Sequence, residues 1–407
     1  MNKRLITTAA VIAVATTQVF ATEGINLIGV GPVQQGTAGA GVASAKDSTW
    51  LILNPAGLTD IRPGIDASLQ VFAPVRTINA ADTSYRANPD GTGSVGTLED
   101  DAAFVIPSIS GSFGCCHGEN GFIGLGVYGT SGMGVDYDYN RVSQDPLGQP
   151  QQTGDKMTEL SVAKMTATYA YKAGDSGFSI GAGPIFVISR LRTDMLNPNT
   201  GALSSGGWDT AYGVGAIIGV NQNFGALSIG GSYMSEQYMS EFDDYNPLLG
   251  DSLNLPQQLT VGAAYNVLDN LELALDYRWT GWDELTTLGD TFGWENQNIV
   301  KAGVTWGVSE ALTLRGGISH GKSPSPDNQV FANALFPAIM ETHLACGVSY
   351  AWEKWSAHLA YIHALEVTQT ESEGVDFTAA GGGANDGQGT EISMYQNSLT
   401  AGVSYNF

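Results

Sequence analysis

Residues 397–407 read NSLTAGVSYNF, and the apolar residues of this stretch recur at every second position. The apolar set is Leu399, Ala401, Val403, Tyr405 and Phe407. A period of two is the period of a β-strand with one apolar face and one polar face. The stretch therefore predicts a strand whose two sides meet different environments.

The end of this strand also bears on how the protein is assembled. A final amphipathic strand that carries Tyr405 and Phe407 is similar to the C-terminal signal of bacterial outer-membrane barrels. These two residues are therefore the candidate assembly signal, and the barrel assembly machinery is an expected partner. A soluble β-sandwich could end in the same way, so the remainder of the chain is needed to distinguish the two classes.

Alternating runs separated by breaks repeat from about residue 64 onward, and the runs number about 14. The breaks are alternately long and short. The long, polar breaks lie near residues 80–102, 133–157, 194–208, 235–255, 282–296, 322–338 and 366–391. The short breaks read GCCHGENG, AGDSG, NFGA, NVLDN, GVSEA and WEK. Long loops at one end and short turns at the other are typical of an even-stranded transmembrane barrel.

The composition favours the same class. Apolar residues make up 43% of the chain and charged residues only 14%, against roughly 25% charged residues in soluble domains. Acidic residues outnumber basic ones by 40 to 17, which argues against nucleic acid as a partner. The three cysteines, Cys115, Cys116 and Cys346, lack the spacing of metal ligands, and we expect neither a metal nor a cofactor.

The alternation also assigns the two faces of the barrel wall. Within residues 270–280, NLELALDYRWT, an apolar face alternates with a face that carries Glu272, Asp276 and Arg278. A charged side chain facing lipid costs about 2–4 kcal/mol near the bilayer midplane, so we expect the charged face to point inward. The same parity places four more ionisable residues in the lumen: Lys301, Arg315, His343 and His358. The sequence thus predicts a polar lumen of mixed charge.

The first residues have the pattern of a targeting segment. Lys3 and Arg4 precede an apolar run, and small residues stand near residue 21. This order is typical of a secretory signal peptide over residues 1–21, with an uncleaved membrane anchor as the alternative.

Residues 22–63 differ from the repeats that follow them. They are rich in Gly and Ala, alternate poorly and are too apolar for a disordered tether. We expect them to fill the lumen as a plug, and residues 64–407 to form the barrel. The plug carries Asn54, Pro55 and Ala56 near its end, where the proline fixes the backbone and the asparagine can bond locally.

Five stretches resemble, in order, the FadL/TodX (OmpP1) family of outer-membrane transporters for long-chain fatty acids and other hydrophobic compounds. They read GTAGAGVASAKDSTWLILNPAGL, FVIPSISGSFG, LPQQLTVGAAYNVLDNLELALDYRWTGW, RGGISHGKSPSPD and THLACGVSYAW. The resemblance implies an all-β fold: a transmembrane antiparallel β-barrel of about 14 strands with an N-terminal hatch inside the lumen. It also implies the outer membrane of a Gram-negative bacterium and makes Asn54, Pro55 and Ala56 the hatch motif.

The resemblance further implies passive uptake of long-chain fatty acids or similar hydrophobic molecules. In that family the ligand moves the hatch and leaves sideways through a gap at a kinked third strand. Here the third strand would be GFIGLGVYGTSGMGVDY, and Gly124, Gly126, Gly129 and Gly132 are the candidate gap residues. Glycine frees a strand to bend, although close packing against the hatch would explain these residues as well.

A carboxylate ligand would need a cation in or near the lumen. Arg278, Lys301 and Arg315 have inward parity and Lys322 lies at a loop junction, so these four are candidates; internal ion pairing is the alternative. Five apolar loop residues are candidates for an entry groove, and packing beneath the loops explains them equally: Leu248, Leu249, Phe331, Leu335 and Phe336.

On the outer side, Arg190 and Arg192 have the parity of lipid-facing residues. We expect them to extend toward lipopolysaccharide phosphates in the outer-membrane lipid. The resemblance implies a monomer.

Parts of the sequence match two other functional classes. A general diffusion porin is the alternative for a barrel with a polar lumen. An enzyme is not expected, because GGISHGKSPSP matches the P-loop and nucleophile-elbow spacings but offers prolines where both motifs need a helix. Ser319 and His343 share inward parity, and nothing more supports a hydrolase.

Overall fold

The computed structural model describes residues 23–79, 97–115, 120–144, 150–194, 207–249, 251–374 and 387–407. Cys116 and the predicted signal peptide, residues 1–21, lie outside these ranges. In the described part of the chain, no helix is both long enough and apolar enough to span a membrane.

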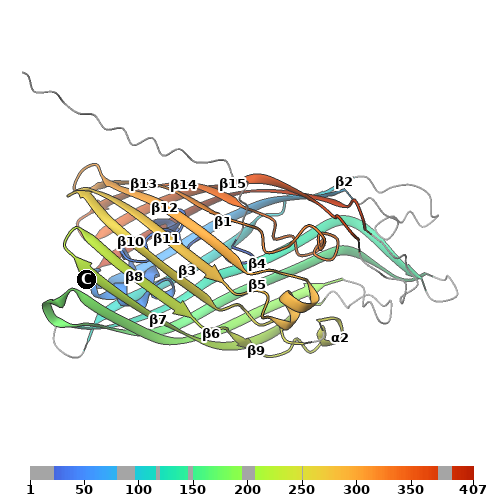
Figure 1. Ribbon diagram of the computed structural model, residues 1–407, viewed down its shortest axis with the longest axis horizontal. Coiled ribbons are helices and arrows are strands. Elements are labelled where there is room, and N and C mark those ends of the chain that lie inside the picture. The colour runs from blue at the N-terminus through green and yellow to red at the C-terminus, as the bar shows by residue number, and fades with distance from the viewer. Residues whose placement is uncertain are drawn as a thin grey trace, which may run out of the picture.

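One antiparallel sheet closes into a barrel with 14 wall strands (Figure 1). Consecutive wall strands are neighbours, and β1 pairs with β16 from Gly64↔Asn406 to Asn79↔Glu391. The wall strands are β1 (Gly64–Asn79), β3 (Phe104–Gly114), β4 (Gly121–Gln144), β5 (Pro150–Lys172), β6 (Phe178–Thr193), β7 (Asp209–Phe224), β8 (Leu227–Met234), β10 (Gln258–Leu268), β11 (Leu271–Thr280), β12 (Gln297–Gly307), β13 (Leu312–Gly321), β14 (Thr342–Trp352), β15 (Trp355–Thr370) and β16 (Glu391–Asn406). Closure confirms the predicted fold class.

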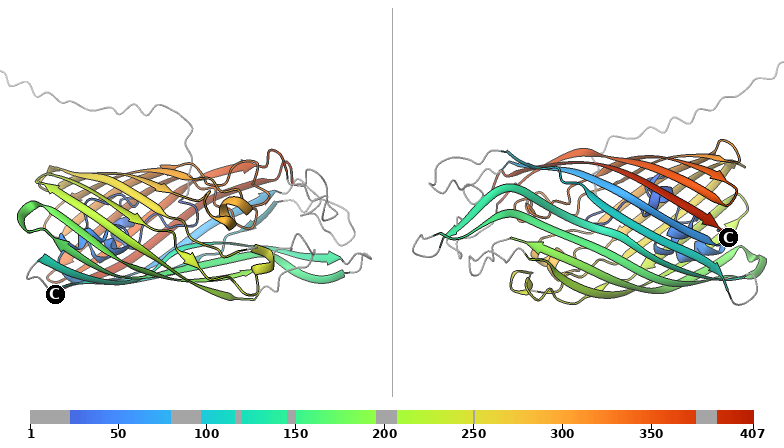
Figure 2. Two further views of the ribbon diagram at one scale, coloured as in Figure 1. Left: turned by 60° about the horizontal axis from the view of Figure 1, so that its bottom comes forward. Right: turned by 180° about the vertical axis from the view of Figure 1, so that it is seen from behind.

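Short turns and long connections lie at opposite ends of the barrel, as the sequence predicts. The end that carries the C-terminus has the short turns, and the long connections lie at the far end (Figures 1 and 2). Two short strands continue the sheet toward the far end: β2 (Thr97–Asp100) pairs with β1, and β9 (Tyr238–Met239) pairs with β7. Because the short turns belong to the periplasmic side of such barrels, the far end is extracellular.

The predicted long loop at residues 133–157 is wrong for most of its length. Strand β4 continues to Gln144 and β5 begins at Pro150, and the two remain paired up to that point. They extend past the rest of the wall at the extracellular end (Figure 1). Polar residues indicated a loop, but a hairpin that pairs its own backbone groups needs no apolar face once it leaves the membrane.

The predicted faces of the wall are confirmed. Leu275 on β11 is 59% exposed to the surroundings, whereas the adjacent Asp276 is 1% exposed. Lys301 and His343 are fully enclosed, as their inward parity requires. Cys346 lies on the outer face. The cost of placing charge against lipid explains why one parity holds along the strand.

Aromatic residues gather at the periplasmic end of the outer face. The ring centroids of Trp355 and Tyr405 lie 4.8 Å apart, and those of Phe113 and Phe407 lie 5.6 Å apart. Amphipathic rings favour the interface between hydrocarbon and headgroups. Tyr405 and Phe407 thus belong to an interfacial girdle, and their role as an assembly signal stays a prediction.

Residues 23–60 lie inside the barrel, nearer the periplasmic end (Figures 1 and 2, dark blue). They form the short helices α1 (Gly31–Gln35), η1 (Ser48–Ile52) and η2 (Pro55–Thr59). Helix α1 contacts β14, β15 and β16, and η2 contacts β5, β6 and β7 on the opposite wall. We refer to residues 23–60 as the plug.

Glycines of the wall allow the plug to approach closely. A Cβ atom on Gly181 of β6 would lie 2.6 Å from the carbonyl carbon of Pro55, and one on Gly317 of β13 would lie 2.2 Å from that of Thr37. Backbone atoms cannot move aside as a flexible side chain can. Glycine at these positions therefore sets the fit between plug and wall.

We predict that Gly181→Ala destabilises the folded barrel by about 1–3 kcal/mol, because the added methyl group overlaps the backbone of Pro55 and Ala56. The urea midpoint of unfolding, followed by the gel mobility of the folded form, measures this effect. Gly114→Ala is the matched control, since its Cβ would meet nothing within 4 Å. Equal midpoints for the two variants would contradict the tight fit.

Candidate functional site

The wall is interrupted between β3 and β4. Their ladder runs from Gly114↔Phe122 to Ser108↔Tyr128 and stops there. Toward the extracellular end, residues 104–107 of β3 pair with β1 alone, and β4 from Gly129 onward pairs with β5 alone. Two strand edges therefore face each other without bonding.

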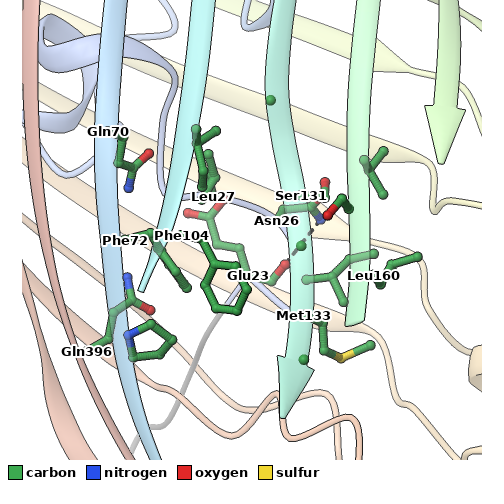
Figure 3. Close-up of a pocket in the computed structure, with 18 of the residues that line it drawn as sticks. Glu23, Asn26, Leu27, Gln70, Phe72, Phe104, Ser131, Met133, Leu160 and Gln396 are labelled. Atoms are coloured by element: carbon green, nitrogen blue, oxygen red, sulfur yellow. Dashed lines mark hydrogen bonds between the residues drawn. The ribbon is translucent and has the colours of Figure 1, made fainter. Parts of the chain in front are cut away.

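The start of the plug occupies part of this unpaired edge. The amide of Leu27 donates to the carbonyl of Thr130 at 2.9 Å, and the amide of Gly132 donates to the carbonyl of Ile25 at 3.1 Å. The hydroxyl of Ser131 donates to Oδ1 of Asn26 at 3.0 Å (Figure 3). Backbone groups at membrane depth need partners within the protein, and residues 25–27 supply them where β3 does not.

The candidate gap glycines divide into two groups along β4. A Cβ on Gly124 would lie 2.0 Å from Cδ2 of Leu51 in the plug, so close packing accounts for this residue. Gly126 lies in the same region, against the ring of Tyr128. Gly129 lies at the break, where the register with β5 shifts by a bulge, and Gly132 lies just beyond it. A bulge bends its strand, and this one lies where the pairing of β4 with β3 has ended.

A cavity of about 580 Å³ lies between the plug, the break in the wall and the lumen (Figure 3). Six apolar residues from five segments line it: Leu27, Phe72, Phe104, Ile106, Met133 and Leu160. Val105 and Val127 line it as well, although they point outward and are 67% and 46% exposed. The cavity therefore continues from the lumen through the break to the lipid-facing side.

An ion cluster lies beside this cavity. The carboxylate of Glu23 bonds both the guanidinium of Arg278 and the ammonium of Lys301, and all three side chains are buried. The ammonium of Lys301 also donates to the carbonyl of Ile28 at 3.0 Å. The carboxylate of Asp276 accepts the amides of Gly41 and Val42 at 2.8 and 2.9 Å. These charges tie the plug to β11 and β12.

Comparison with known proteins assigns this chain to a family. A family model described as "Outer membrane protein transport protein (OMPP1/FadL/TodX)" matches residues 12–407. The chain belongs to this family. The family is one of outer-membrane transporters and not of enzymes, and the protein is an outer-membrane protein of the Gram-negative type.

Solved structures support the fold assignment. The P. putida toluene transporter TodX aligns with a TM-score of 0.70 at 17% identity, over 94% of this chain and 99% of that one. A Pseudomonas aeruginosa FadL homologue aligns with a TM-score of 0.70 at 16% identity, over 96% and 100% of the two chains. Outer membrane protein P1 of Haemophilus influenzae is 26% identical over 110 residues, which span only 24% of this chain and 23% of that protein.

The structure places the candidate cations of this FadL/TodX family member outside the cavity lining. Arg278 and Lys301 contact Glu23, which does line the cavity. Arg315 donates to Ser349 at 2.5 Å and belongs to a polar chain that runs through His358 and Ser404 to Asp66. Lys322 is exposed in a loop, 3.8 Å from Glu295.

The candidate groove residues lie in an apolar cluster beneath the extracellular loops. Leu249, Phe331, Leu335 and Phe336 are buried there, and the rings of Phe336 and Phe292 contact each other edge to face at 5.1 Å. Leu248 lies in helix α2 (Asn246–Leu249), and its side chain is outside the described part. The π-helix η5 (Thr286–Thr291) packs in the same cluster. None of the four described residues lines the cavity.

The predicted hatch motif, Asn54, Pro55 and Ala56, contacts both the plug and the wall. Asn54 begins helix η2 by accepting the amide of Ala56 at 3.1 Å. Its Nδ2 atom donates to the carbonyls of Val42 and Val220, at 2.8 and 3.2 Å. One side chain thus caps a helix, braces the plug and bonds the backbone of β7.

Sequence reasoning missed Glu23 and most of the cavity lining. Glu23 follows the predicted leader and belongs to no alternating run, so strand parity could not assign its side chain to the lumen. One signal for the break was present in FVIPSISGSFG. Pro107 has no backbone N–H to give to β4, and proline within a strand pattern indicates a free edge.

We predict that the stability of the barrel falls between pH 5 and pH 8 partly through Asp47 in the plug. Burial and the nearby carboxylate of Asp66 raise the pKa of Asp47 from 3.8 to about 7, against opposing hydrogen bonds from Thr49. The folded chain then binds the extra proton between about pH 4 and pH 7, so stability decreases as pH rises through that window.

The measurement is the thermal midpoint of unfolding at pH 5 and at pH 8. Asp47→Asn keeps the acceptor for the amide of Thr49, which lies at 2.9 Å, and removes the titration. Its midpoint should change less between the two pH values than that of the unaltered protein. An identical change would show that Asp47 does not titrate in this range.

Proposed function

We propose that this protein takes up long-chain fatty acids or similar hydrophobic molecules passively across the outer membrane. The observation that carries the proposal is the cavity that begins beside the plug and continues to the outward-facing Val105 and Val127. A molecule held there has a direct path into the bilayer between β3 and β4. TodX and TbuX, two of the similar structures, are described as toluene transporters, so small aromatic hydrocarbons are candidates as well.

The energetics suit such a route. Each buried CH₂ group gains about 0.8 kcal/mol on leaving water, so a hydrophobic molecule enters an apolar cavity readily. A water-filled pore gives it no such gain. Transfer from the cavity into the bilayer is also downhill, and no energy source is required.

The plug is the element that ligand would move. Residues 25–27 bond the edge of β4 and line the cavity at the same time, so a ligand that displaces them widens the path through the wall. Such a shift requires only that ligand bind the displaced arrangement more tightly.

The outer face carries groups suited to membrane lipid. The guanidinium groups of Arg190 and Arg192 lie 4.5 and 5.0 Å from the ring of Trp208, near the extracellular ends of their strands. We propose that they contact lipopolysaccharide phosphates and that the protein acts as a monomer after assembly by the barrel machinery.

We predict that Gly132→Trp lowers uptake of labelled oleate and toluene by about tenfold or more, since a loss of about 1.4 kcal/mol of binding suffices. A Cβ on Gly132 would contact only the carbonyl of Leu160, at 3.2 Å, which leaves the cavity as the space for the indole. Uptake into cells that lack their own transporter is the measurement.

Gly114→Trp is the matched control, because the same residue would enter open space at the periplasmic end of β3. It should transport like the unaltered protein. Equal transport by both variants would argue against the route through the break. Failure of the unaltered protein to transport any hydrophobic ligand would refute the proposed function itself.

A second prediction separates this function from that of a general diffusion porin. The plug fills the lumen between α1 on one wall and η2 on the other, so the protein in planar bilayers should pass far less ionic current than an open porin. Replacing residues 23–60 with a short Gly-Ser linker should raise the conductance several-fold. A large ohmic conductance in the unaltered protein would favour the porin instead.

A further inference from the structure

We propose that Glu23 makes the cavity selective for uncharged hydrophobic molecules over molecules that carry an ionised carboxylate. The inference rests on the proposed function and narrows its substrate class, because a fatty acid would then enter as the protonated, uncharged acid.

Two acids among the described residues line the cavity, and each already bonds a cation. Glu159 bonds the guanidinium of Arg192 at 2.7 Å on the outer side, whereas Glu23 holds the cations of the lumen. Glu23 lines the cavity (Figure 3) and is 1% exposed. Its carboxylate already bonds Arg278 and Lys301. Neither cation reaches the lining itself. A built-in carboxylate thus occupies the position at which these cations would otherwise hold the head of a fatty acid.

The other cations near the cavity either have a partner of their own or lie outside the lining. Arg76 bonds the carboxylate of Asp100 at 2.7 Å and the carbonyl of Gly134 at 2.7 Å. Arg190 lies at the outer mouth, over Trp208. Lys164 is buried outside the lining, with its ammonium 3.6 Å from the sulfur of Met234.

Apart from the carboxylate of Glu159, the polar groups that remain in the lining are neutral. Asn26, Gln70 and Gln396 contribute amides, residues such as Ser131 contribute hydroxyls, and His343 contributes its imidazole. They can bond a hydroxyl or carbonyl group of a ligand. They cannot offset the loss of water around an ionised carboxylate, which needs a cation of its own once it is buried.

A second carboxylate would also lie beside the first. Like charges repel strongly when they are brought together in a buried site, and we expect discrimination of about tenfold or more. The cavity therefore accepts hydrocarbons, alcohols and similar uncharged molecules, and rejects the ionised acid of the same chain length. Removal of the charge on Glu23 should relax this choice.

The test compares dodecanol with dodecanoate, which share a chain and differ in the head group. Binding of each radiolabelled compound to the purified full-length protein is measured in amphipol at pH 8, where the acid is ionised, and corrected for partition into empty amphipol. We expect the unaltered protein to prefer dodecanol by about tenfold or more. In Glu23→Gln this preference should fall by about tenfold, because Arg278 and Lys301 are then free to bind the acid.

Two variants control for charge and folding. Glu310→Gln makes the same substitution on an exposed periplasmic turn and should keep the preference of the unaltered protein. The double variant Glu23→Gln with Lys301→Gln removes one cation together with the acid, and should lose most of the gain in dodecanoate binding. Gel mobility of the folded form shows whether each variant has assembled.

The unaltered protein alone can overturn the inference. Equal binding of dodecanoate and dodecanol by the unaltered protein would refute the proposed selectivity and leave the proposed function intact. A preference that Glu23→Gln does not alter would remove Glu23 as its cause. If neither compound binds and Gly132→Trp changes nothing, the proposed function fails and the inference fails with it.

Discussion

Backbone N–H and C=O groups at membrane depth must find partners within the protein, and this demand governs both the closure of the barrel and the contacts of the plug. Pairing of β1 with β16 meets that demand at the seam of the barrel. The same demand explains the place of residues 25–27, which bond β4 beyond Tyr128 where β3 has separated from it. A gap between two wall strands can exist only if other polar groups of the protein bond the backbone of the exposed strand edge. Here the start of the plug supplies those groups.

The constraint made much of the fold predictable from the sequence. A strand that faces lipid on one side and a polar lumen on the other must alternate, and one charged residue such as Asp276 then fixes the parity of its whole strand. Short turns such as AGDSG give the strand order, because consecutive strands must pair. Alternation is required only where a strand faces lipid. Beyond the membrane the hairpin of β4 and β5 does not need it, and the polar sequence there indicates a loop although the strands remain paired.

The candidate site was less predictable because it depends on contacts between distant parts of the chain. Inward parity found Arg278 and Lys301, but no local pattern relates either residue to Glu23, which lies more than two hundred positions away. Loop residues such as Phe336 offered apolar character alone, and that character suits a buried cluster as well as a groove. Pro107 was informative, since a missing donor has a structural consequence wherever the strand is placed.

The contacts of the plug divide it into a fixed part and a part that can move at lower cost. Residues near Thr37 and Pro55 meet wall glycines so closely that Gly317 and Gly181 have no room for a Cβ atom, and a shift there would break backbone packing on two walls. Residues 25–27 are held by a few hydrogen bonds to one strand edge, whereas Glu23 before them is fixed by its buried ion pairs with Arg278 and Lys301. Opening the wall therefore needs the second set of contacts to break and not the first. The energy that a ligand has to supply is then the cost of freeing one short segment, which a single buried alkyl chain can match.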